Sequence, residues 1–311
     1  DLFYITSNVL SKMKEILIGA KPDIVLVHGD TNTAFAASLA AFYLQIKIGH
    51  LESGLRTRNI YSPVPEEFNR RATSILADYN FSPTEFSKEN LIKENIDKKK
   101  IFVTGNTIID ALYFVIDKIN NNKKFRDELI QQINLNGYKF KIGKKILLFT
   151  CHRRENFGKG FIKIFNAIKG LANNNPDIDF VFPMHHNSNV RTPAVKILSN
   201  VDNIFLISAL QYEYFIFLMK NSYLVITDSG GIQEEAPALG KPVLVIRDNT
   251  ERVEGIKAGT LKVIGTEIHS ILAEVQKLLD DNTEYEKMSK SHNPYGDGKS
   301  SMRIVNYLYE K

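Results

Sequence analysis

Three acidic side chains stand near the ends of consecutive predicted elements, where they could exchange protons with a substrate. Asp30 follows a predicted strand at 24–27, and Glu52 ends a second strand at 47–51. Because the carboxyl ends of parallel strands meet at one edge of a sheet, both carboxylates should lie at that edge. Glu66, at the start of the next predicted helix, adds a third acid. General acid–base catalysis uses carboxylates positioned in this way.

Each of these acids also has a structural interpretation. Asp30 could cap the helix that follows it, a common role for aspartate that is slightly favoured on local grounds. Glu52 could pair with Arg56, and the Glu66-Glu67 pair suits the positive end of a helix. The convergence of three acids on one edge nevertheless favours a reactive site.

A second pattern, in residues 224–246, is typical of a phosphate-binding turn. A buried strand runs into Gly230 and Gly231, and a helix begins directly after them. The first NH groups of a helix lack partners, so an anion placed there meets donors and the positive end of the helix dipole. Glu235 could complement that dipole or bind a ribose hydroxyl, and spacing alone leaves both interpretations open.

Basic side chains follow three other strands of this half of the chain. His152 and Arg153 could hold a diphosphate through charge-assisted hydrogen bonds, or they could belong to a surface ion-pair network. His185 places another imidazole at the same edge, and Arg247 lies in a charged loop after a further strand. The histidines lack HExxH or comparable spacing, so no metal site is expected.

The elements that must position these residues alternate between strand and helix, which predicts parallel sheets covered by helices. A polar, turn-rich stretch at 120–145 separates two such alternations. In the first, strands are predicted at 24–27, 47–51, 79–81 and 101–103, and helices at 32–45, 66–77, 85–94 and around 107–120. In the second, strands are predicted at 145–149, 178–182, 203–206, 223–226, 242–246 and 261–264, and helices at 159–173, 189–198, 211–219, 231–239, 267–279 and 299–310. A helical pattern also precedes the first strand.

Composition narrows the class of protein. The 311 residues are 43% hydrophobic and 24% charged, which is ordinary for a globular chain of two domains. A single cysteine, Cys151, excludes a disulfide framework and fits a reducing cytoplasm. The net charge of +5 is spread over lysine runs, so no nucleic acid is expected as a partner, and no apolar run is long enough to span a membrane. Because the GxGxxG and GxxxxGK[ST] fingerprints are absent, no cofactor is expected.

Taken together, the motifs of both halves resemble the non-hydrolysing UDP-N-acetylglucosamine 2-epimerases, in the order that this family keeps. They are HGDTNT, HLESGLRT, SPVPEEFNRR, GNTIIDAL, HRRENFG, HHNSNVR and TDSGGIQEEAPALGKPVLVIRDNTER. The departures are few: Val253 stands where proline is usual, Ser53 where alanine is common, and Cys151 where glycine or alanine is common. The family's first strand and its Gly-Thr-Arg-Pro-Glu turn have no counterpart here, so we expect the N-terminal domain to be truncated.

The resemblance implies an α/β fold of two Rossmann-like domains facing a cleft, the B-type glycosyltransferase architecture. It assigns residues 1–122 to the domain with the catalytic acids, 123–292 to the UDP-binding domain, and 293–311 to a helix that returns to the first domain. It also implies UDP-N-acetylglucosamine as substrate and as a second, activating ligand, and a cytoplasmic homodimer that supplies bacterial surface polysaccharide synthesis.

Residue roles also follow from the resemblance, position by position. The catalytic positions it implies are Asp30, Glu52, Glu66 and His152. The UDP-binding positions are His185, Phe215, Ser229, Gly230, Gly231 and Glu235, to which the loop residue Arg247 is added. The activator would lie beside Glu66, His152 and Arg153.

The implied reaction eliminates UDP across C1–C2 of the sugar, giving 2-acetamidoglucal, and adds UDP back with protonation from the other face. Asp30 and Glu66 would remove and return the proton, Glu52 would support them, and His152 with Arg153 would stabilise the leaving group. A retaining glycosyltransferase of the same architecture and a non-catalytic sugar-nucleotide-binding protein remain alternatives.

Overall fold

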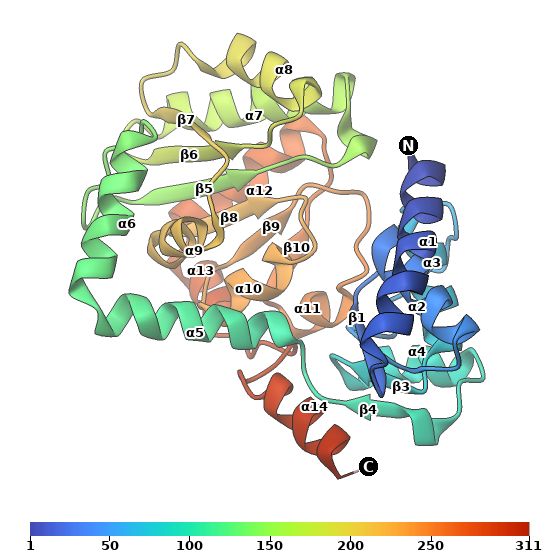
Figure 1. The fold of residues 1–311 in the computed structure, drawn as a ribbon. Helices are drawn as coiled ribbons and strands as arrows, with labels where there is room; N and C mark the ends of the chain where they lie inside the picture. Colours follow the sequence, from blue (N-terminus) through green and yellow to red (C-terminus); the bar gives the residue numbers. More distant parts are fainter. Residues whose placement is uncertain (311) are drawn as a thin grey trace. The chain divides into compact units, whose positions relative to one another are not determined.

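The computed structural model describes residues 1–310, and these form two compact α/β units (Figure 1). Unit 1 comprises Asp1–Ala111 and Tyr295–Lys311, and unit 2 comprises Leu112–Pro294. Each unit is built on one parallel sheet, which confirms the expected fold class.

Unit 1 contains a four-stranded sheet in the order β1-β2-β3-β4. Its elements are α1 (Leu2–Ala20), β1 (Ile24–His28), α2 (Asn32–Tyr43), β2 (Lys47–Leu51), α3 (Glu66–Leu76), β3 (Tyr79–Ser82), α4 (Glu85–Lys93), β4 (Ile101–Val103) and α14 (Ser300–Tyr309). The in-register pairing of Val27 with His50 and of His28 with Leu51 brings the carboxyl ends of β1 and β2 side by side. Residues just after these strands therefore meet at one edge, as parallel pairing requires.

The core of unit 1 lies between the sheet and its helices. Helix α2 is rich in alanine, and its small side chains allow it to pack between α1 and α3. Ala37, Ala41 and Ile48 are among the residues of this core. Helix α14 adds Tyr307, whose ring lies 3.9 Å from that of Phe102 on β4, so the last helix belongs to unit 1.

Unit 2 contains a six-stranded sheet in the order β10-β9-β8-β5-β6-β7. Its elements are α6 (Lys123–Leu135), β5 (Ile146–Thr150), α7 (Lys159–Asn174), β6 (Asp179–Met184), α8 (Ser188–Leu198), β7 (Ile204–Ser208), α9 (Tyr212–Asn221), β8 (Leu224–Thr227), α10 (Ile232–Ala238), β9 (Val243–Val245), α11 (Val253–Ala258), β10 (Leu261–Val263), α12 (Ile268–Asp280) and α13 (Asn282–Ser289). Counted from β5, this is the 3-2-1-4-5-6 order of a Rossmann fold. The order reverses between β5 and β8, and ligands of such sheets bind at that point.

Both faces of the unit 2 sheet are covered, as the nearly continuous apolar runs of its strands predict (Figure 1). Successive side chains of β5 alternate between the faces. Leu147 and Phe149 pack with α7, α8 and α12, whereas Ile146 and Leu148 pack with α5 (Thr107–Asn121), α6 and α9. The two apolar layers hold the strand ends of this unit in fixed positions.

The structure differs from the predicted elements where polar segments form helices. Residues 123–135, within the predicted boundary at 120–145, form α6, because Asn122 caps it and Leu129 and Ile133 bury one face. Residues 282–289 form α13, which Asp281 caps and none of whose side chains is fully buried. The predicted domain boundary at residue 122 falls at the end of α5, whereas the two units divide inside that helix.

The described residues contain neither a membrane-spanning helix nor a cluster of metal-binding side chains. Among residues 1–310, no helix is long and apolar enough to cross a membrane. The same residues contain no group of three or more histidine, cysteine, aspartate or glutamate side chains that could hold a metal ion.

Candidate functional site

Asp30 is not the cap of α2, because the neighbouring residue performs that function. The side chain of Thr31 accepts the NH of Ala34 at 3.1 Å. Asp30 instead receives Nη2 of Arg70, on α3, at 2.5 Å, and its backbone carbonyl receives Nδ2 of Asn69. The structural interpretation of Asp30 is therefore wrong, and its carboxylate is held at the strand edge by a buried guanidinium.

Glu52 is held beside Asp30 by the shape of its own backbone. Its φ of 63° is in the left-handed region, which glutamate adopts rarely. A Cβ on Gly29 would lie 3.0 Å from Oε2 of Glu52, so only glycine leaves room for that carboxylate beside Asp30. Asn106 donates to Oε1 at 3.3 Å. The structural alternative expected from sequence was a pair between Glu52 and Arg56.

Arg56 has another partner. Its Nε and Nη2 donate to Glu94 at 2.9 and 2.8 Å, a two-pronged contact that matches the planar fork of the guanidinium. Glu52 is therefore not needed to neutralise Arg56. This leaves the Glu52 carboxylate at the strand edge with an amide donor and, 3.8 Å away, Nε2 of His28.

Glu66 and Glu67, adjacent in sequence, have opposite environments. Glu67 is fully buried and accepts the backbone NH groups of Thr57 and Arg58, at 3.0 and 3.2 Å, together with Nη1 of Arg70. Oε2 of Glu66, in contrast, is buried with no hydrogen-bond partner in the described structure. A buried polar atom without a partner is uncommon and points to a ligand or a functional role. Glu67 therefore supports the loop, and Glu66 is the available acid.

Behind these acids lies a buried imidazole. His50, on β2, contacts the carbonyl of Gly29 through Nε2 at 2.9 Å and lies 3.3 Å from the hydroxyl of Ser74 through Nδ1. Burial lowers its pKa to about 3, so the ring is neutral at pH 7. It must donate through Nε2 to the carbonyl, which fixes the turn that carries Asp30.

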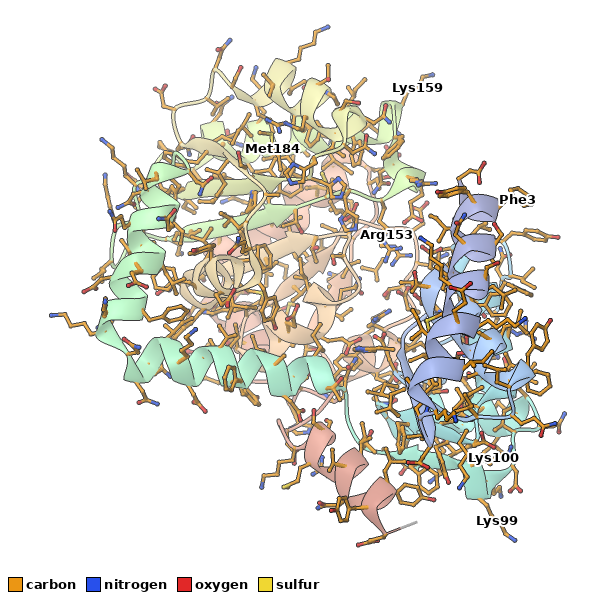
Figure 2. The ribbon with its side chains drawn as sticks, in the orientation of Figure 1. Phe3, Lys99, Lys100, Arg153, Lys159 and Met184 are labelled. Carbon is orange, nitrogen blue, oxygen red and sulfur yellow. The ribbon has the colours of Figure 1, made fainter. Side chains whose placement is uncertain are left out.

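In unit 2, the switch point between β5 and β8 is closed by one buried carboxylate. Asp228, after β8, accepts the backbone NH of Arg153 at 2.8 Å and that of His152 at 2.9 Å. Its Oδ1 also lies 3.2 Å from Nδ1 of His152. Figure 2 labels Arg153, in the loop after β5, and Met184, the last residue of β6. Asp228 thus joins the loop after β8 to the loop after β5.

The pKa of His152 is lowered, mainly by burial, with further lowering by Arg153, His185 and Arg247 and an opposing effect of Asp228. The ring is therefore neutral in the unliganded protein at pH 7. Because Asp228 can only accept, Nδ1 carries the hydrogen and Nε2 is the free lone pair. The ring of His185 stacks on His152 with centroids 5.5 Å apart, and its Nδ1 accepts the NH of Asn187, which leaves Nε2–H as a donor.

The glycine turn after β8 has the donors that an anion needs. No acceptor among the described residues takes the NH groups of Gly230 or Gly231, while those of Glu234 and Glu235 bond to the carbonyl of Gly231. The guanidinium of Arg252 lies against Gly230, 3.1 to 3.3 Å from where a Cβ would be. A larger residue at position 230 would displace this cation.

Arg247 is buried in the loop after β9. Its side chain is 1% exposed and donates to Glu155 at 2.9 Å and to Glu251 at 3.1 Å. Glu251 also contacts Arg252, which in turn bonds Glu234 at 2.9 Å. Arg247 therefore anchors a buried charge network beside the turn, and Arg252, which is also buried, is the cation of this network that lies against Gly230.

Glu235 is 4% exposed and receives a hydrogen bond from the hydroxyl of Tyr212 at 2.6 Å. Burial raises the pKa of this carboxyl to about 7, and the bond from Tyr212 partly opposes the rise. Phe215, one turn further along α9, is half-buried against the second core face. If Glu235 only complemented the helix dipole, it would need no hydrogen bond from Tyr212, so the helix-dipole interpretation does not explain this contact.

With this geometry established, comparison with known proteins identifies the family. A sequence profile of the UDP-N-acetylglucosamine 2-epimerases matches residues 1–309. The chain belongs to this family. A curated UDP-N-acetylglucosamine 2-epimerase of Campylobacter jejuni is 55% identical over 308 residues, which cover 99% of this chain and 80% of the relative.

Solved structures of the family agree with the fold of both sheets. The epimerase of Neisseria meningitidis, bound to UDP-GlcNAc, has a TM-score of 0.96 and 48% identity over 100% of this chain and 82% of its own. The epimerase of Methanocaldococcus jannaschii, in complex with UDP-GlcNAc and UDP, has a TM-score of 0.85 and 34% identity over 98% of this chain and 81% of its own. The expected truncation of the N-terminal domain is not confirmed by these matches and stays a prediction.

Within each unit, the structure brings together most of the epimerase residues expected from sequence. Asp30 and Glu52 meet at one strand edge, with Glu66 one helical turn from the arginine that holds Asp30. Sequence reasoning missed Arg70, Asp228, Arg252 and Tyr212. Arg70, Arg252 and Tyr212 act through contacts between residues distant in sequence. Asp228 could have been identified from its position, because a carboxylate directly after β8 must face the loop after the neighbouring strand.

Proposed function

We propose that this chain interconverts UDP-N-acetylglucosamine and UDP-N-acetylmannosamine. Membership of the epimerase family supports the substrate, as does the relative from Neisseria meningitidis that holds UDP-GlcNAc. The observation that carries the proposal is the acid cluster at the edge of β1 and β2, because a nucleotide-binding turn alone would also suit a transferase or a binding protein.

The chemistry explains why several acids are needed. The C2–H bond of the pyranose is not next to a carbonyl, so direct removal of its proton gives no stabilised anion. Elimination avoids this difficulty: a carboxylate takes the C2 proton, the C1–O bond breaks with its electron pair on UDP, and a C1–C2 double bond forms. Addition of UDP to C1 and protonation of C2 from the opposite face then give the epimer.

Asp30 and Glu66 are proposed to handle the two proton transfers. Asp30 is paired with Arg70, which suits a group that must be ionised to accept a proton. Oε2 of Glu66 has no donor in the described protein, so nothing competes with a ligand proton for it. Glu52, beside Gly29, is proposed to support Asp30.

The leaving UDP is proposed to be held by unit 2. The NH groups of Gly230 and Gly231 and the side chain of Ser229 would contact its phosphates, and Glu235 its ribose. His185 and Phe215 would contact the rest of the nucleotide. His152 and Arg153 would stabilise the charge that develops as the C1–O bond breaks, because the diphosphate favours a protonated imidazole.

Solvent-deuterium incorporation at C2 tests the reaction. The chain is incubated with UDP-N-acetylglucosamine in D₂O without an acceptor, and NMR follows C1 and C2. We expect UDP-N-acetylmannosamine with deuterium at C2, followed by deuterium in the recovered substrate. Epimer without deuterium would exclude the elimination route. Free N-acetylmannosamine would indicate a hydrolysing enzyme, turnover only with an acceptor a glycosyltransferase, and binding without turnover a non-catalytic protein.

We also propose a second nucleotide-sugar molecule as activator, near Glu66, His152 and Arg153, and a homodimer as the active form in the cytoplasm. The relative in complex with both UDP-GlcNAc and UDP supports the accommodation of two nucleotide ligands. Activation would appear as a sigmoidal rate curve for UDP-N-acetylmannosamine that a trace of UDP-N-acetylglucosamine makes hyperbolic. A hyperbolic curve without that addition would argue against a second site.

A further inference from the structure

Within the described residues, Tyr212 is the one side chain that donates a hydrogen bond to Glu235. It stands at the first position of α9, and its hydroxyl donates to Oε1 of Glu235, on α10, at 2.6 Å. The other oxygen, Oε2, accepts no hydrogen bond from the described residues, and it is not one of the fully buried atoms that lack a partner. The carboxylate therefore has one oxygen engaged and the other open to a ligand.

We propose that Tyr212 is a positioning residue that orients Glu235 toward the ribose hydroxyls of the nucleotide sugar, and that this pair makes the site selective for ribonucleotides over deoxyribonucleotides. The inference rests on the proposed function, in which Glu235 contacts the ribose. Tyr212 itself need not contact the substrate.

Two neighbouring acids show why the pair is suited to this role. Glu234, adjacent to Glu235, is fully buried and bonded to Arg252, so its carboxylate supports the charge network. Among the described residues no cation pairs with Glu235, whose partner is the neutral hydroxyl of Tyr212. When this carboxylate is ionised, no cation neutralises it, so its charge is available to hydroxyl donors of a ligand, and hydrogen bonds to a charged acceptor are the stronger kind.

The protonation of Glu235 supports the same role. Its pKa is about 7, raised by burial and partly lowered by the bond from Tyr212. The other titratable groups around the pair are Glu213 on α9, which acts on Tyr212, and the ion-paired Glu234 on α10. A protonated carboxyl is a poor acceptor, so ribose recognition should be complete above this pKa and should weaken as the pH falls below it.

The test compares Tyr212→Phe with the unchanged chain, using UDP-N-acetylglucosamine and its 2′-deoxy and 3′-deoxy analogues. Binding of UDP-N-acetylglucosamine at pH 7 should weaken about 10-fold, and binding of at least one deoxy analogue by less than about 2-fold, as expected for loss of one charge-assisted contact. Tyr214→Phe is the matched control, because Tyr214 lies on the same helix and its hydroxyl makes no hydrogen bond to the described residues. It should leave all three affinities unchanged.

The pH profile and a double variant separate positioning from a structural effect. Removing the donor raises the pKa of Glu235 further, so the loss of affinity on acidification should begin at a higher pH in Tyr212→Phe. In a Glu235→Gln background, Tyr212→Phe should add little, because the charged acceptor is already gone.

The inference would be overturned if Tyr212→Phe weakened the binding of UDP-N-acetylglucosamine and of both deoxy analogues equally and left the pH profile unshifted. Loss of packing alone would have this effect. Unchanged affinities would also overturn the inference. Failure of the proposed function would look different: the unchanged chain would then not bind UDP-N-acetylglucosamine, or would bind it without epimerising it.

Discussion

Replacing Asp228 by asparagine should reverse the tautomer of His152. Asparagine has the same shape, and its single oxygen can take the place of Oδ2, where it would still accept both backbone NH groups. Its NH₂ group would then face Nδ1 of His152, now 3.2 Å from Oδ1. Because two donors cannot face each other, the imidazole hydrogen must move from Nδ1 to Nε2.

The magnitude follows from the distance. Opposite unit charges 3.2 Å apart interact by about 5 kcal/mol at an effective dielectric constant of about 20. The His152 side chain is 37% exposed, so solvent screening reduces this to about 1–3 kcal/mol. Loss of the Asp228 charge should therefore lower the pKa of His152 further, because Asp228 is the group that opposes the lowering. The free energy of unfolding should fall by about 1–3 kcal/mol, because two charge-assisted bonds become neutral ones.

The assay is ¹⁵N NMR of the histidine ring nitrogens across a pH titration, combined with kcat for epimerisation. We expect the signals of His152 to exchange tautomer, and kcat to fall by about 10²–10⁴-fold, as in other Asp–His pairs that lose their tautomer. Asp179→Asn is the control, because Asp179 is also buried in unit 2 and accepts the hydroxyl of Tyr138 at 3.0 Å. It should lower stability without changing His152. If Asp228→Asn folds, keeps the original tautomer and retains kcat, our account of this pair is wrong.

Three further predictions concern unit 1. Glu66→Gln should abolish deuterium exchange at C2 while changing the free energy of unfolding by less than about 1 kcal/mol. Glu67→Gln should lower the free energy of unfolding by about 2–4 kcal/mol, because a buried acceptor of two NH groups loses its charge. Equal stability of the two variants would contradict this difference between the two acids. Arg70→Lys should lower kcat at least about 10-fold, since a lysine cannot bridge both Asp30 and Glu67, and an unchanged kcat would show that Asp30 needs no guanidinium. Thr31→Ala should lower the free energy of unfolding by about 1 kcal/mol through loss of the α2 cap, with kcat retained, as denaturant titration and kinetics can check.

Much of the fold follows from local sequence because parallel strands and their helices have distinct patterns. The apolar run at 146–150 and the alanine-rich helix 32–43 are unmistakable in period and composition. Helix α6, in a polar segment, was not predicted, because its few apolar residues gain their burial only against the sheet of unit 2. Short polar helices depend on such packing more than on propensity.

The reactive residues also divide into those that could be identified from sequence and those that only the tertiary structure separates. Asp30, Glu52 and the glycine turn could be identified from sequence, because residues at strand ends must share an edge and because glycines before a helix leave NH groups free. Residue type and spacing could not separate Glu66 from Glu67, and in the sequence only the family resemblance distinguished them. The tertiary structure separates them, since buried NH groups reach only Glu67.

What the sequence by itself determined is therefore the family, the two sheets and the types of group at their edges. Only the tertiary structure decided which partner each charge has: Arg70 for Asp30, Asp228 for His152, Arg252 for Glu234 and Tyr212 for Glu235. The physical reason is that strand and helix patterns are local, whereas an ion pair or hydrogen bond depends on distances of a few ångströms between elements far apart in the chain. Those distances exist only once both apolar layers have packed.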